Sequence, residues 1–142
     1  MTEADIIAAL RAHWLAQGSN LTTGGDVPQP ALQWWEDDEG EPDPPVPYHR
    51  CTIRSAANAS VTIGRTREEN RGLVTVQVFA PAEAGPGPAE RLASMVAARW
   101  RLFRHPRIVL GPPQVVSLAR QGAFNRQMIT VGWRGDLRPA QQ

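Results

Sequence analysis

The sequence contains no lysine, so all 15 basic side chains among its 142 residues are arginines. A phosphate-binding P-loop needs a lysine that reaches the β- and γ-phosphates. Schiff-base and pyridoxal phosphate chemistry need a lysine amine. These chemistries and the serine–lysine hydrolases are therefore excluded. Arginine keeps its charge and presents a planar fork of donors that suits carboxylates, phosphates and protein interfaces.

Cysteine and long apolar runs are equally scarce. The single cysteine, Cys51, allows no internal disulfide, which fits a reducing compartment. No apolar run approaches the ~18 residues of a membrane span. The first residues are acidic where a signal peptide is basic. With 42% apolar and 20% charged residues, we expect one soluble domain over residues 1–142.

Few side chains are arranged for catalysis or metal binding. His49 and Cys51 lie two residues apart, as in a Cys–His dyad, which would need an exposed thiolate. A lone cysteine is more often a small buried residue, so we expect Cys51 in the core and His49 at a strand edge. With only His13 and His105 besides, no zinc site is clustered. We therefore expect no enzyme activity, cofactor or metal.

The net charge of +1 conceals a division of the chain. Residues 1–47 carry nine acids and one arginine, for −8, and residues 48–142 carry five acids and fourteen arginines, for +9. Six of the acids form a run, which predicts electrostatic contact between molecules or a solvated acidic loop. These acids are Glu36, Asp37, Asp38, Glu39, Glu41 and Asp43. A hard-cation site is disfavoured because the run lacks the ligand positions and central glycine of an EF-hand loop.

Arginines supply the opposite charge in the rest of the chain. Those expected at an interface are Arg50, Arg54, Arg65, Arg67, Arg71, Arg99, Arg101, Arg104 and Arg107. A basic stripe of this kind also suits a nucleic-acid-binding module, because arginines can follow the phosphates. No recognised module is present, and the acidic run would oppose the approach of DNA. Interface arginines account for the same residues.

The N-terminal third predicts a helix followed by a long loop. The helix spans about residues 3–17, with Thr2 as its N-cap. Its apolar side chains recur every three or four residues along one stripe, formed by Ile6, Ile7, Leu10 and Trp14. Residues 19–47 are rich in proline, glycine and acids. Within them, the flanking prolines allow residues 31–35 to form only an edge strand.

The remaining two-thirds predict strands around a second helix. This helix begins at Pro88 or Ala89 and ends near Arg104, and a charged connector is expected over residues 64–71. The predicted strands are residues 48–54, 59–63, 73–80, 108–110, 114–120 and 127–134. The order predicts a single α+β domain in which an antiparallel β-sheet carries two α-helices packed on one face. Residues 137–142 are expected to fray.

Three segments in this order resemble those of a known family. They are the strands around Pro47–Ile53, Gly72–Pro81 and Ile129–Trp133, of which the second precedes a glycine-rich turn and a helix. These segments follow an N-terminal helix that begins with the pattern Met-Thr-x-x-x-Ile. In this arrangement the chain resembles the tail terminator proteins of long-tailed (siphovirus-like) phages and phage-like particles. The long acidic loop departs from the shorter loops of the family, and the resemblance implies that its run Glu36–Asp43 lies at a subunit interface or at the lumen of a ring.

The resemblance implies a structural virion protein that caps the head-proximal end of the tail tube as a hexameric ring. The ring would end tube polymerisation and provide the head–tail joining surface, after assembly in the host cytoplasm. The implied partners are further copies of the chain, the tail tube protein, the head–tail connector protein and DNA that passes through the lumen without specific binding; no membrane is implied. A head-completion or connector ring protein of the same particle remains an alternative, as does the arginine-rich nucleic-acid-binding module.

Overall fold

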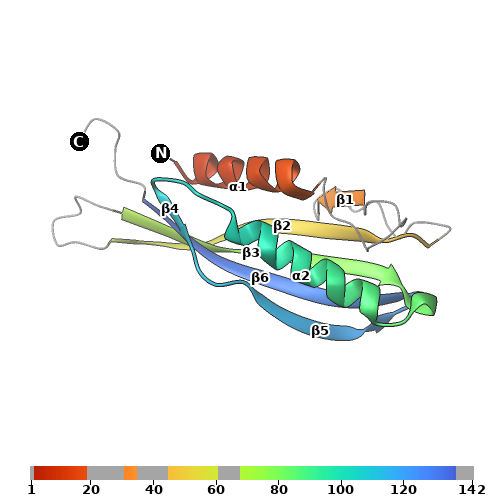
Figure 1. The fold of residues 1–142 in the computed structure, drawn as a ribbon. Helices are drawn as coiled ribbons and strands as arrows, with labels where there is room; N and C mark the ends of the chain where they lie inside the picture. Colours follow the sequence, from red (N-terminus) through yellow and green to blue (C-terminus); the bar gives the residue numbers. More distant parts are fainter. Residues whose placement is uncertain (1, 19–30, 35–44, 61–67, 137–142) are drawn as a thin grey trace.

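The computed structural model describes residues 2–18, 31–34, 45–60 and 68–136 (Figure 1). The acidic run at 36–43, the arginines Arg65 and Arg67, and the C-terminal residues 137–142 lie outside the described residues. The helices are α1 (Glu3–Gly18) and α2 (Gly87–Arg101), with a short 3-10 turn, η1 (Ala82–Ala84). The strands are β1 (Ala31–Trp34), β2 (Tyr48–Ser60), β3 (Glu68–Pro81), β4 (Ile108–Leu110), β5 (Gln114–Gln121) and β6 (Phe124–Asp136).

These strands form one sheet with the order β1-β2-β3-β6-β4, in which β5 also pairs with β6. The long strands β2 and β3 form an antiparallel pair, and β6, the last strand in the chain, lies antiparallel to β3. On its other side β6 pairs first with β5 and then, at Trp133–Gly135, with β4. All these pairings are antiparallel except that of β1 with β2, which is parallel.

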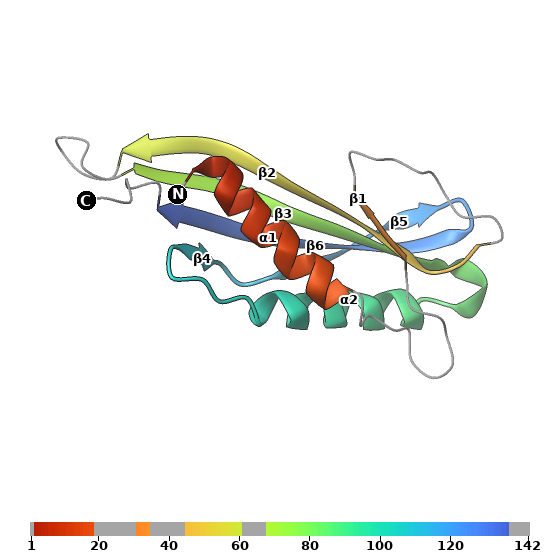
Figure 2. The same cartoon turned by 90° about the horizontal axis from the view of Figure 1, so that it is seen from above.

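Both helices cover the same face of the sheet (Figures 1 and 2). Apolar residues of α1, α2 and the facing strands form one buried core, in which the indole rings of Trp14 and Trp100 stack with their centroids 5.2 Å apart. A Cβ atom on Gly135 would collide with Ile6, so this glycine allows α1 to approach β6 closely. The predicted α+β fold with two helices on one face is confirmed.

The start of α1 is fixed by a reciprocal pair of hydrogen bonds. The Thr2 hydroxyl accepts the backbone N–H of Asp5 at 3.2 Å, and the Asp5 carboxylate accepts the N–H of Thr2 at 2.8 Å. This capping box satisfies two of the N–H groups that a helix start leaves unpaired. Hydrogen bonding to the carboxylate by the backbone N–H of Thr2, and then by its side chain, lowers the pKa of the Asp5 carboxyl below its ordinary value. The prediction of Thr2 as N-cap is confirmed.

Element boundaries differ from prediction chiefly in the β2–β3 hairpin. The strands predicted at 48–54 and from residue 59 are one strand, β2, with a register shift between Ser55 and Ala57. The predicted connector 64–71 is wrong for its last four residues, which belong to β3. Pairing with β2 and β6 holds these polar residues extended despite their low strand propensity. The edge strand predicted near 31–35 is present at 31–34.

The beginning of β2 is buried on both faces. On the helix-free face the rings of Tyr48 and Phe79 stack 4.3 Å apart, and Phe124 meets Tyr48 edge-on at 5.2 Å. On the other face His49 is fully buried and meets the Trp14 ring edge-on. The prediction that His49 lies at a strand edge is therefore wrong, because β1 flanks this part of β2 and α1 covers it. Cys51 is buried as predicted.

Candidate interaction surface

The sheet face opposite the helices carries several arginines. Strand alternation directs the residues between the core positions of β2, β3 and β6 to this helix-free face. Its arginines are Arg50, Arg54, Arg71, Arg126 and Arg134. Leu73 lies on the same face and remains 45% exposed. A cationic face with an exposed apolar residue is typical of a surface that contacts another macromolecule.

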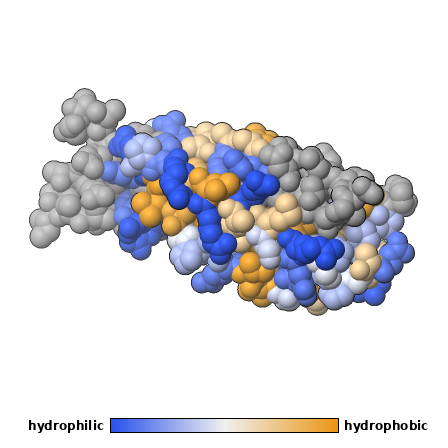
Figure 3. Space-filling model, viewed as in Figure 1, coloured by the Kyte–Doolittle hydropathy of each residue, from blue (hydrophilic) through white to orange (hydrophobic). Residues whose placement is uncertain are grey.

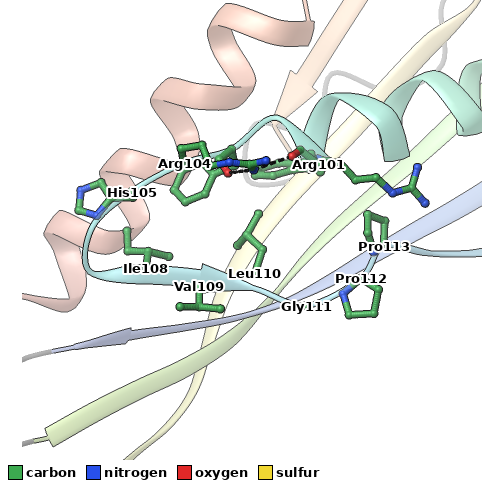
Figure 4. Close-up of a pocket in the computed structure, with 11 residues that line it drawn as sticks. Arg101, Arg104, His105, Ile108, Val109, Leu110, Gly111, Pro112 and Pro113 are labelled. Carbon is green, nitrogen blue, oxygen red and sulfur yellow. Dashed lines mark hydrogen bonds between the residues drawn. The ribbon is translucent and has the colours of Figure 1, made fainter.

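A depression of about 460 Å³ lies between the end of α2 and β4 (Figure 4). Its walls are largely apolar, with arginine and histidine side chains at the rim. The lining residues are Trp100, Arg101, Phe103, Arg104, His105, Ile108, Val109, Leu110, Gly111, Pro112 and Pro113. Figure 3 shows hydrophobic surface gathered where α2 ends and β4 begins. Leu102 and Val109 in this region are 56% and 54% exposed, respectively.

A second depression, of about 450 Å³, lies on the other side of β4. It is bordered by Arg71, Gly72, Val109, Leu110, Gly111, Gly132, Trp133 and Arg134. Val109, Leu110 and Gly111 line both depressions. The short strand β4 therefore forms a ridge between two hollows, with the exposed Val109 side chain on it and arginines on both sides.

Four of the predicted interface arginines lie around β4 and the two hollows. Arg101 and Arg104 line the first hollow, and Arg71 borders the second. The Arg71 guanidinium also pairs with the Glu69 carboxylate at 2.6 Å. Arg107 begins the turn into β4, where its N–H donates to Nδ1 of His105 at 3.1 Å and its carbonyl accepts the N–H of Asp136 at 3.0 Å.

Arg104 also has a structural role at the end of α2. Its Nη1 donates to the carbonyl oxygens of Arg101 and Phe103 at 2.8 and 2.7 Å. The Arg101 carbonyl belongs to the set that a helix C-terminus leaves without partners, and a cation there complements the helix dipole. The helix ends at Arg101, three residues before the predicted end, and Arg104 caps it from outside.

The other predicted arginines lie away from the two hollows. The Arg50 guanidinium lies over the rings of Tyr48 and Phe79, 5.7 and 5.8 Å from their centroids. Arg54 donates from Nε to the Thr52 hydroxyl at 3.5 Å. Arg99 is half-buried in α2, and its carbonyl accepts a hydrogen bond from Nε2 of His13 at 2.9 Å. These positions do not form one cluster with Arg101 and Arg104.

Arg134 and Val109 were absent from the sequence-based candidates. Alternation alone could have placed Arg134 on the solvent side of its strand, because its neighbour Trp133 faces the core. Its position directly opposite Arg71 depends on the register of β3 with β6, which joins residues 63 positions apart. No local signal in the sequence determines that register.

Burial affects the titration of two histidines among the described residues. Burial lowers the pKa of His49 from 6.5 to about 4, so it is neutral at physiological pH. Burial also lowers the pKa of His13, against the opposing effect of its hydrogen bond to Arg99. Among the described residues, no group of three His, Cys, Asp or Glu side chains could hold a metal ion. Neither described helix is long and apolar enough to cross a membrane.

Comparison with known proteins identifies the class of the molecule. A family model described as "Phage tail terminator protein" matches residues 5–109. The chain therefore belongs to the phage tail terminator family, as its sequence pattern indicated. This is a family of structural tail proteins, so the chain is a component of a phage tail.

Structural comparison supports the fold independently. Nine chains among solved structures match this one. One of them has a TM-score of 0.67 at 20% sequence identity, and the match covers 98% of this chain and 99% of that chain. At this identity the likeness establishes the fold alone. No curated protein matches the sequence.

Proposed function

We propose that this tail protein forms a closed ring on the head-proximal end of the tail tube. The ring ends tube polymerisation and presents the surface to which the head is joined. Family membership is the observation that carries this proposal. The exposed apolar and cationic surface around β4 supports it, since a subunit that works only in an assembly needs contact surface on several sides.

The role proposed is structural. The partners are neighbouring copies of the chain, the tail tube protein and the head–tail connector protein, with DNA passing through the lumen. The acidic run Glu36–Asp43 then meets the arginines of a neighbouring copy. In the alternative arrangement, it lines the lumen and repels the passing DNA.

Removal of the protein tests the main proposal. Particles assembled without it are expected to contain tails of uncontrolled length that fail to join heads, when viewed by negative-stain electron microscopy. Restoring the protein in trans should restore both length and joining. Tails of normal length joined to heads in its absence would contradict the proposal. A connector role instead predicts normal tails and the protein located on the head side of the junction.

The arginines of the helix-free face favour one alternative, a nucleic-acid-binding module. Contacts between arginines and phosphates release counterions, so binding of this kind weakens steeply with salt. Filter binding of a DNA duplex at increasing salt distinguishes the ring protein from the nucleic-acid-binding module. A ring protein that only lets DNA pass shows little retention even at low salt, whereas a binding module shows strong retention that salt abolishes.

A further inference from the structure

We propose that the hollow around Gly132 on the helix-free face receives residues 35–43 of a neighbouring copy, with its carboxylates against Arg71 and Arg134. This inference rests on the proposed ring, because it names the contact by which one subunit would hold the next. It assigns a function to a surface that neither the core nor the helices use.

The hollow owes its shape to missing side chains. Gly132 lies on the helix-free face between β3 and β4, and a Cβ atom there would meet nothing within 4 Å. The N–H of Gly111 donates to the Gly132 carbonyl at 2.8 Å, so bare backbone lines this part of the surface. Val109 forms an apolar border, and Arg71 and Arg134 form a cationic one. Such a site suits an extended segment that carries acids beside an apolar side chain.

The charges of the hollow are incompletely compensated within the described chain. Arg71 and Arg134 are directly opposite each other in the β3–β6 register, and both are exposed. Like charges in this arrangement destabilise a sheet. Glu69 pairs with Arg71 at 2.6 Å, but no acidic side chain among the described residues pairs with Arg134. An anionic partner would therefore stabilise this part of the sheet.

The chain itself contains a segment of the complementary chemistry. Residues 36–43 hold six carboxylates in eight positions, and the aromatic residue Trp35 directly precedes them. No other stretch of the sequence combines such a density of negative charge with an apolar side chain. The carboxylates can pair with the arginine forks, and the indole can cover the Val109 side of the hollow.

The positions at which the acidic segment joins β1 and β2 favour a contact with the hollow of a second copy over a contact with the hollow of its own chain. Trp34 pairs with Cys51, and the chain returns to β2 at Tyr48, whereas Arg71 pairs with Ala57 farther along the same strand. The path from Cys51 to the level of Ala57 and back to Tyr48 is about 50 Å at ~3.3 Å per residue. Residues 35–47 span only about 45 Å when fully extended. Within its own chain the segment therefore falls short of Arg71 even when fully extended, whereas the segment of a second copy is not subject to this limit.

Disulfide trapping tests the contact directly. Gly132→Cys is tolerated sterically because the space beyond it is open, and Gly40→Cys preserves all six acids. The native Cys51 is buried and stays out of the reaction. In tails carrying the double variant, mild oxidation is expected to give a ladder of disulfide-linked multimers on non-reducing gels. Each single variant serves as control and should give no ladder.

The other outcomes overturn the inference in distinguishable ways. A disulfide-linked monomer shows that the segment docks within its own chain. Rings visible on the tails without any disulfide show that the segment lies elsewhere, including at the lumen. Wild-type tails without a ring at the head-proximal end overturn the proposed function itself, and the inference with it.

Charge reversal supplies a second, independent measurement. Arg71→Glu with Arg134→Glu is expected to reduce the recovery of rings on tails at least tenfold, and adding Glu36→Arg with Asp38→Arg should restore it. Arg120→Glu with Arg126→Glu makes the same change in charge at the opposite end of the sheet and should leave recovery within twofold. Circular dichroism must show that each variant is folded. If Arg71→Glu with Arg134→Glu leaves the recovery of rings on tails unchanged, the inference is contradicted. It is also contradicted if these substitutions reduce only the retention of DNA on filters.

Discussion

Gly72 and Gly132 occupy neighbouring positions in the sheet but have opposite surroundings. Gly72 pairs with Trp133, and a Cβ atom on it would collide with the indole ring and with the backbone carbonyl of Arg54. Gly132 pairs with Leu73 and faces open space on the helix-free face. The first glycine is required by packing, whereas the second is compatible with larger residues as far as the fold is concerned.

We therefore expect Gly72→Ala to lower the free energy of unfolding by roughly 2–3 kcal/mol, because neither the buried indole nor the backbone can move away cheaply. Gly132→Ala should change it by no more than ~0.5 kcal/mol. Urea denaturation of both variants, followed by tryptophan fluorescence, measures the difference. Equal effects at the two positions would contradict the close approach of Trp133 to Gly72.

The buried imidazole of His49 makes stability depend on pH. Its pKa is lowered from 6.5 to about 4 by burial, and neither ring nitrogen has a hydrogen-bond partner among the described residues. Between pH 6.5 and about 4 the unfolded chain binds a proton that the folded chain does not. Stability from this group is therefore complete above pH 6.5 and falls as the pH drops, by roughly 3 kcal/mol at pH 4 and below.

Urea denaturation at pH 7 and pH 4.5 measures this dependence, with His49→Phe as the comparison. The variant lacks the titrating group, so its stability should fall much less over the same interval. His13, whose pKa is lowered in the same direction, is present in both proteins and cancels in the difference. An identical loss of stability in the two proteins would show that His49 is not the group responsible.

Prediction from sequence succeeded for residues whose burial follows from local periodicity. Ile6, Leu10 and Trp14 are buried at helical spacing, and the alternating valines of β3 are buried in the sheet. It failed for His49 and omitted Trp100, whose burial depends on the approach of α1 to distant elements. The acidic run remains a prediction, because it lies outside the described residues.

At the scale of elements, the end of α2 is capped by a side chain from outside the helix. The sequence predicted a helix up to about Arg104, with Phe103 on its buried stripe and Pro106 ending it. Instead, the helix ends at Arg101, and the Arg104 guanidinium donates to the carbonyls of Arg101 and Phe103. The following turn directs the chain into β4, and the first hollow is the space enclosed between the two.

Arg104→Ala is expected to remove this cap and lower the free energy of unfolding by about 1 kcal/mol. Arg101→Ala serves as the matched control, because no hydrogen bond joins the Arg101 side chain to another described residue. Thermal denaturation monitored by circular dichroism compares the two. A larger loss from Arg101→Ala would contradict the capping role.

Pairing partners explain which elements were hard to predict. The strands at 108–110 and 114–121 agree with prediction almost to the residue, because turns or prolines bound them. The polar beginning of β3 lacks the pattern of a strand and is held by its neighbours. The parallel pairing of β1 was equally beyond local reasoning, since it depends on the path of the intervening loop.

In the whole molecule, the described helices cover one face of the sheet and leave the other uncovered. One carries both helices and contains the core, which stabilises the subunit. The opposite face presents arginines and the hollow around Gly132, which we propose for contact with the next subunit. Sequence reasoning recovered the fold class and the family. It could not locate this surface, because Arg71, Val109 and Arg134 are brought together only by the long-range register of β6.

The place of β6 in the sheet also governs when the molecule can form. This strand follows all the other described strands in the sequence, yet it lies between β3 and the edge formed by β4 and β5, and it supplies Ile129, Val131 and Trp133 to the core. During synthesis, β4 and β5 have no strand to pair with until β6 leaves the ribosome. The sheet is therefore completed only after β6 has left the ribosome, so the subunit becomes competent for assembly as a whole and not in parts.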